Sequence, residues 1–132
     1  MSNCKGMILH CMDFRIQTAV ETWVKDQGFQ DDVDRVAFAG SCLNGDFALE
    51  MIQASSRLHN IDTVFLTQHE ECGAYGDLFA TKPLADAKEQ LVSDMTALRR
   101  RVSEALPNVQ VRTLWVGKSG DNWIVEEILE EG

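Results

Sequence analysis

The chain has 132 residues, of which 45% are hydrophobic and 25% are charged, and its formal net charge is -9. This length fits one hydrophobic core, and we expect a single domain that spans residues 1–132. The negative charge argues against a nucleic-acid partner and against an anionic membrane surface, and no apolar run approaches the roughly 20 residues that cross a bilayer.

The four cysteines bear on where the protein works. Four cysteines could form two disulfides in a secreted chain, but the first residues lack the apolar core of a secretion signal. We therefore expect a cytoplasmic protein. Its cysteines would then be reduced and available for metal binding or catalysis.

The first half of the chain predicts two strands, each followed by a helix. Residues 6–11 are an apolar run typical of a buried strand, and apolar side chains at helical spacing follow as far as Gly28, a plausible helix cap. Residues 29–34 are polar and predict a loop. A second apolar run at residues 36–39 predicts the next strand, after which Asn44 can cap a second helix.

The second half continues the alternation. Residues 63–67 are β-branched or aromatic and predict a third strand. A glycine-bearing connection over residues 69–83 leads to a long helix over residues 84–106, which a proline ends. Residues 109–116 predict a fourth strand. The apolar spacing in the tail from Asp121 favours a short helix, with a fifth strand as the alternative.

This alternation predicts a three-layer α/β fold, in which helices cover both faces of a mostly parallel sheet. Ligands of such sheets bind beyond the carboxyl ends of the strands, where the strand order reverses. A strand order of 2-1-3-4, with a fifth edge strand left open, places the first and third strands side by side at that reversal. Cys11 ends the first strand and His69 ends the third, so we expect these two residues to meet at one edge of the sheet.

Two short stretches at these strand ends carry metal-binding side chains. Cys11 lies in the first stretch, and His69 and Cys72 lie in the second. Two thiolates and one imidazole suit Zn²⁺ and leave its fourth tetrahedral position open. Arg15 can hold the carboxylate of Asp13 through two parallel hydrogen bonds, so that Asp13 orients a zinc-bound hydroxide. If Arg15 releases it, Asp13 can take the fourth position itself, and the sequence leaves both states open.

The pattern Cys11-x-Asp13-x-Arg15, followed by His69-x-x-Cys72, resembles the signature of the β-class carbonic anhydrases. The resemblance implies that the two cysteines and the histidine bind zinc, and that Asp13 and Arg15 form a catalytic dyad beside the open position. It implies a lyase that reversibly hydrates carbon dioxide to bicarbonate. A homodimer is also implied by the family.

Two departures from the family pattern keep alternatives open. The first strand begins almost at once, where family members usually carry a helical arm that wraps a partner subunit. After the second strand, where the family has Asn-Ala-Gly-Asn, the chain reads Phe38-Ala39-Gly40-Ser41. The alternatives are a noncatalytic zinc protein with Asp13 as the fourth ligand, a related zinc hydrolase of carbon disulfide or carbonyl sulfide, and a metal-free binding module.

The remaining cysteines and charged side chains near these motifs have simpler interpretations. We expect Cys42 to be a packed thiol and Cys4 to be an idle one near the N-terminus. His59, near a helix end, suits the helix dipole and needs no function. We expect Glu70 and Glu71 to be solvated, with a proton-relay role as the alternative.

Overall fold

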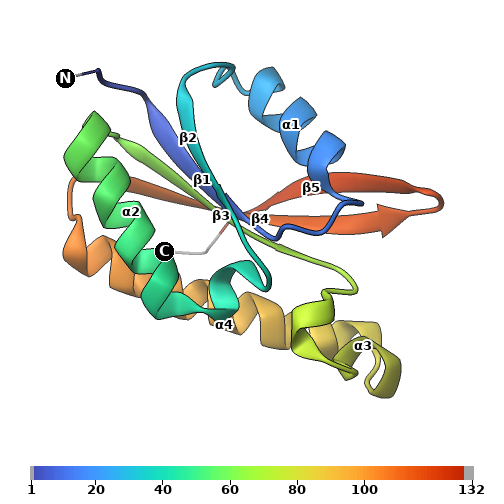
Figure 1. Cartoon of the computed structure of the whole chain (residues 1–132). Coiled ribbons are helices and arrows are strands. Elements are labelled where there is room, and N and C mark those ends of the chain that lie inside the picture. The colour runs from blue at the N-terminus through green and yellow to red at the C-terminus, as the bar shows by residue number, and fades with distance from the viewer. Residues whose placement is uncertain (1, 130–132) are drawn as a thin grey trace.

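The computed structural model describes residues 2–129 and contains a five-stranded sheet flanked by helices (Figure 1). The sheet order is β2-β1-β3-β4-β5, in which the first four strands run parallel and β5 runs antiparallel to β4 at one edge. This result confirms the predicted α/β class and the 2-1-3-4 order. The strands are β1 (Gly6–His10), β2 (Val33–Ala37), β3 (Thr63–His69), β4 (Gln110–Ser119) and β5 (Asn122–Ile128).

Helices cover both faces of this sheet, as the alternation predicted. In Figure 1, α1 lies on one face, and α2 and the long α4 lie on the other. The side chain of Asn44 caps α2 by accepting a hydrogen bond from the backbone N–H of Phe47. Among residues 2–129, no helix has both the length and the apolar character needed to cross a membrane. The helical segments are α1 (Gln17–Asp26), η1 (Ser41–Leu43), α2 (Gly45–His59), η2 (Gly73–Tyr75), α3 (Leu78–Thr81) and α4 (Leu84–Ala105).

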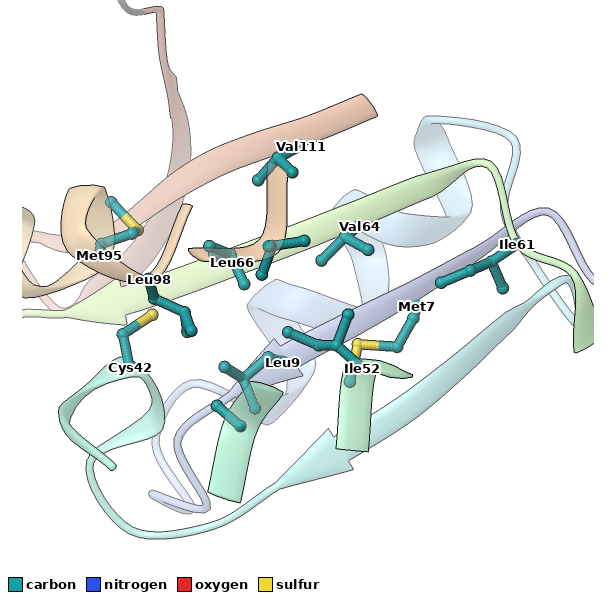
Figure 2. Close-up of a cluster of buried hydrophobic side chains, with 12 residues drawn as sticks. Met7, Leu9, Cys42, Ile52, Ile61, Val64, Leu66, Met95, Leu98 and Val111 are labelled. Carbon is teal, nitrogen blue, oxygen red and sulfur yellow. The ribbon is translucent and has the colours of Figure 1, made fainter. Parts of the chain in front are cut away.

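The two central strands form the middle of the core. Every residue of β1 and β3 is buried, because each strand has a neighbour on both sides and helices above and below. Alternate side chains point to opposite faces, so Met7 and Leu9 pack towards α2 and α4 (Figure 2), whereas Ile8 packs towards α1. This packing fixes the position of the carboxyl ends of both strands.

The tail forms a strand, so the preference for a short helix was wrong and the alternative of a fifth strand is correct. Exposed and partly buried side chains alternate along β5, which is the period of a strand that is covered on one face. Gly120, with a φ of +63°, lies in the tight turn between β4 and β5, where glycine adopts this conformation without steric cost. Pairing with β5 also satisfies the backbone groups along the outer side of β4.

The second strand also differs from its prediction, because β2 begins at Val33, inside the segment expected to be a loop. An edge strand has only one neighbour, so polar side chains can lie in it at little cost. Asp34 accepts a hydrogen bond from Ser55, and Arg35 forms an ion pair with Glu21 at 2.6 Å. These partners explain why a polar segment continues the sheet.

Candidate metal centre

The carboxyl ends of β1 and β3 bring the two metal-binding stretches together. Cys11 immediately follows β1, His69 is the last residue of β3, and these strands are parallel neighbours. A positive φ of 61° at Glu71 turns the chain so that Cys72 comes back to the same point. One ligand atom each from Cys11, His69 and Cys72 lies within 4.8 Å of the other two, and all three side chains are buried. This group could therefore hold a metal ion.

The imidazole of His69 is oriented as in a metal ligand. Its Nδ1 lies 2.8 Å from the carbonyl oxygen of Glu70, and because a carbonyl only accepts, Nδ1 carries the proton. The lone pair is then on Nε2, which is buried and has no hydrogen-bond partner among the described residues. An unpartnered buried nitrogen is costly, and a bound cation would satisfy it. The donor set of two sulfurs and one nitrogen fits a borderline-soft divalent ion such as Zn²⁺.

The two thiols of the site share a proton. The sulfurs of Cys11 and Cys72 lie 3.9 Å apart. A hydrogen bond from the Cys72 thiol lowers the pKa of Cys11, and the same contact raises the pKa of Cys72. The pair therefore gives up one proton readily and retains the second. A divalent cation between the sulfurs would replace the retained proton and stabilise both thiolates.

Arg15 holds the carboxylate of Asp13 beside this centre. Its Nε donates to Oδ1 at 3.1 Å and its Nη2 donates to Oδ2 at 2.8 Å, which makes a two-point contact. These hydrogen bonds, working against partial burial, lower the pKa of Asp13, so its carboxylate is ionised. The Oδ2 atom lies 4.0 Å from Nε2 of His69. Asp13 is therefore adjacent to the metal-binding atoms while both of its oxygens are engaged by Arg15.

Glu71 is a second anchor for Arg15, whereas the sequence predicted a solvated side chain. Nη1 of Arg15 donates to Oε1 of Glu71 at 2.9 Å, and Nζ of Lys118 lies 3.3 Å from Oε2. The guanidinium also lies over the ring of Trp123, 5.1 Å from its centroid. The only sequence signal was the position of Glu71 next to Cys72, because Arg15 lies 56 residues away along the chain.

Further hydrogen bonds fix the backbone around the site. The Gln17 amide donates to the carbonyl oxygens of Cys11 and Asp13, at 3.1 and 2.7 Å. The Thr67 hydroxyl donates to the Leu9 carbonyl at 2.8 Å and so links β3 to β1. Cys42 is a packed thiol, as expected, and its burial raises its pKa to about 12.

An open cavity of about 530 Å³ adjoins the site between α1 and β5. Arg15, Trp23 and Trp123 contribute to its wall, whereas the three metal-binding residues do not. Arg15 therefore lies between this cavity and the candidate metal centre, since it lines the cavity and also contacts Asp13. Small molecules in the cavity would meet the guanidinium before they meet the metal-binding atoms.

Comparison with known proteins identifies the family. Residues 1–129 match the family described as "Putative carbonic anhydrase". The chain belongs to this family. A protein of Rickettsia bellii is 27% identical over 142 residues, which cover 98% of this chain and 85% of that protein. A protein of Rickettsia conorii is 25% identical, with 98% of this chain and 75% of that protein covered. Both carry the name "uncharacterized protein".

Solved structures of carbonic anhydrases share the fold. The carbonic anhydrase of Glaciozyma antarctica aligns with a TM-score of 0.62 and 16% identity, covering 95% of this chain and 83% of that chain. For β-carbonic anhydrase isoform I of Trichomonas vaginalis, the TM-score is 0.62, the identity 16% and the coverage 97% and 84%. For a tetrameric β-carbonic anhydrase of Sordaria macrospora, the TM-score is 0.63, the identity 14% and the coverage 97% and 82%. At these identities the likeness shows the fold alone.

Proposed function

We propose that this member of the carbonic anhydrase family binds one Zn²⁺ through Cys11, His69 and Cys72 and reversibly hydrates carbon dioxide to bicarbonate. The observation that carries the proposal is the unpartnered Nε2 of His69, which lies with two thiols beside an ionised Asp13. Asp13 and Arg15 are the catalytic residues of this proposal. The membership of the family supports the reaction class.

The chemistry divides between the ion and the protein. A zinc ion in this site would lower the pKa of water and so make it a nucleophile near neutral pH. Asp13 accepts a hydrogen bond from the attacking water through its carboxylate and orients a lone pair of that water towards carbon dioxide. Arg15 keeps Asp13 ionised and in place, and Glu71 holds the guanidinium from its other side.

A noncatalytic zinc protein is the competing function, and one distance favours it. Oδ2 of Asp13 lies only 4.0 Å from Nε2 of His69, so a small movement would let the carboxylate become the fourth ligand. The hydrogen bonds from Arg15 to both oxygens of Asp13 oppose this movement. They support the catalytic proposal over the noncatalytic one.

Stopped-flow hydration of carbon dioxide by the zinc-loaded protein tests the proposal. We expect catalysis well above that of the Cys72→Ser variant, which loses one thiolate ligand. A rate no better than that of the variant would reject the proposed activity. The same protein assayed with carbon disulfide and carbonyl sulfide would then test the related hydrolase activities. Zinc analysis and a structure of the loaded protein would show whether Asp13 occupies the fourth position.

The same proposal extends to assembly and location. Met12 and Phe14 are 63% and 86% exposed on the stretch that also carries Cys11. Neighbouring exposed apolar side chains are typical of interfaces, and they support a homodimer in which this face of the single domain is covered. Reduced cysteines as zinc ligands fit a cytoplasmic location. Sedimentation velocity at several concentrations would measure the assembly state.

A further inference from the structure

A second group of metal-binding side chains lies at the opposite edge of the sheet, where the parallel strands begin. Cys4 precedes β1, Asp34 is near the start of β2, and His59 is the last residue of α2. One sulfur, one carboxylate oxygen and one ring nitrogen from these residues lie within 4.8 Å of one another. The carbonic anhydrase signature includes none of the three.

The backbone assembles this group without help from an ion. The N–H of Cys4 donates to the carbonyl oxygen of His59 at 3.1 Å, which attaches the N-terminal segment to the end of α2. Asp34 is fixed in the sheet by its pairing with Met7 of β1. A metal ion would therefore find three donors in place and would not have to order a flexible chain.

The side chains have the character of ligands with solvent access. Nδ1 of His59 lies 2.6 Å from Oδ2 of Asp34, which also accepts a hydrogen bond from Ser55 at 2.6 Å. The side chains of His59 and Asp34 are 36% and 30% exposed, and Cys4 is partly buried. Partial burial by itself would raise the pKa of Asp34. The hydrogen bonds from Ser55 and His59 outweigh this effect, so the pKa is lowered and the carboxylate stays charged.

We propose that Cys4, Asp34 and His59 form a second Zn²⁺ site, in which water takes the fourth position. A thiolate, an imidazole and a carboxylate are the three ligand types that zinc accepts, and the partial exposure leaves room for water. Zinc would replace the hydrogen bond between Asp34 and His59 and the proton on Cys4. The ion would clamp the N-terminal segment, β2 and α2 together. The shortest of these links joins Asp34 to His59, which lie 25 residues apart along the chain.

Zinc stoichiometry and competition with a coloured chelator test this site on the full chain. We expect two zinc ions per chain in the unaltered protein. The Cys4→Ser and Asp34→Asn variants should each retain one ion and bind the other more than about tenfold more weakly. Cys72→Ser should lose the ion held by Cys11, His69 and Cys72 and should keep the ion held by Cys4, Asp34 and His59. The variants therefore distinguish a failure of one site from a failure of the other. Asp62→Asn removes an equal charge from an exposed residue at the same end of the sheet and should keep both ions.

Cobalt substitution adds a direct signature of the sulfur ligand. In the Cys72→Ser variant, Co²⁺ bound at the second site should give a thiolate-to-metal absorption band that disappears when Cys4→Ser is added. One zinc ion per unaltered chain that Cys4→Ser retains in full would overturn the proposal, as would a second ion whose affinity changes less than twofold in both Cys4→Ser and Asp34→Asn. If Cys72→Ser does not fold, the zinc content of the unaltered chain is compared with that of Cys4→Ser alone. We expect Cys4→Ser to fold, because Cys4 is only partly buried.

Discussion

Single side chains around Asp13 determine what the candidate centre can do. The carboxylate is held by the guanidinium of Arg15, and a metal ion bound beside His69 would compete for it. Arg15 in turn is divided between Asp13 and Glu71, which accept from different nitrogens of the same group. A guanidinium held on two sides loses little further entropy when it orients Asp13, so the dyad is preorganised.

Asp13→Asn tests the dyad directly. The amide has nearly the same shape, but it carries no charge and cannot accept through both positions from Arg15. We expect hydration of carbon dioxide to fall by about 100-fold or more, while zinc content stays at the level of the unaltered protein. Stopped-flow rates and metal analysis on the same samples measure both quantities. An unchanged rate would remove Asp13 from the mechanism.

Glu71→Gln tests the second anchor, and Glu70→Gln is its matched control. Loss of the charge at Glu71 frees one side of Arg15, so we expect a several-fold lower hydration rate with unchanged zinc content. The carboxylate of Glu70 instead accepts a hydrogen bond from the backbone N–H of Lys118, so Glu70→Gln should retain most of the rate. Equal rates for the two variants would show that Glu71 has no positioning role.

The buried thiol of Cys42 predicts a loss of stability at alkaline pH. Burial raises its folded-state pKa to about 12 from an ordinary value of 9.0. Its stabilisation is therefore complete below pH 9 and is lost as the pH rises towards 12, because only the unfolded chain releases the proton in that window. The expected slope from this group is about 1.4 kcal/mol per pH unit. Urea unfolding from pH 8 to 10.5 should show a shallower slope in Cys42→Ala than in the unaltered chain.

At the level of elements, the hairpin of β4 and β5 supplies two side chains that contact the residues around the candidate site. It places Trp123 under the guanidinium of Arg15 and brings Lys118 to Glu71. These contacts depend on the register between the two strands, which pairs Lys118 with Trp123. A shift by one residue would turn both side chains to the opposite face of the sheet.

Gly120→Ala tests the turn that sets this register. Within residues 2–129, no atom beyond the two adjacent residues lies within 4 Å of an added Cβ, so the expected cost comes from the positive φ alone and amounts to about 1 kcal/mol. Gly73→Ala is the control, because that residue also has open space around it but no positive φ. Chemical denaturation of both variants measures the difference, and equal stabilities would show that the turn does not strain the alanine.

At the level of the whole molecule, the candidate centre joins two strands that are distant in the sequence. A zinc ion held by Cys11 at the end of β1 and by His69 at the end of β3 would bridge the middle of the sheet. Such an ion would bind the folded chain more tightly than the unfolded one, because only folding brings the three ligands together, and it would stabilise the fold by mass action. Without the ion, the buried lone pair of Nε2 has no partner and one thiol of the pair stays protonated, and the unpartnered nitrogen lowers the stability of the fold.

Removal of zinc should therefore lower the melting temperature. At a free zinc concentration 100 times the dissociation constant, the stabilisation is about 2.7 kcal/mol, which corresponds to several degrees for a chain of this size. Calorimetry with and without a chelator measures the shift. The experiment is best done in the Cys4→Ser background, so that only the centre of Cys11, His69 and Cys72 contributes. Adding Cys72→Ser to that background should abolish the difference.

The sequence by itself determined the alternation of elements, the 2-1-3-4 order and the meeting of Cys11 with His69, because buried parallel strands leave a local apolar pattern and their carboxyl ends share one edge. The tertiary structure alone decided that the tail is a strand. Its apolar spacing fits the period of a helix as well as that of a strand, and the pairing with β4 favours the strand. It also decided the contact of Glu71 with Arg15 and the grouping of Cys4 with His59. These side chains lie on turns and element ends, where the path of the backbone in space, and not the local pattern, determines which groups meet.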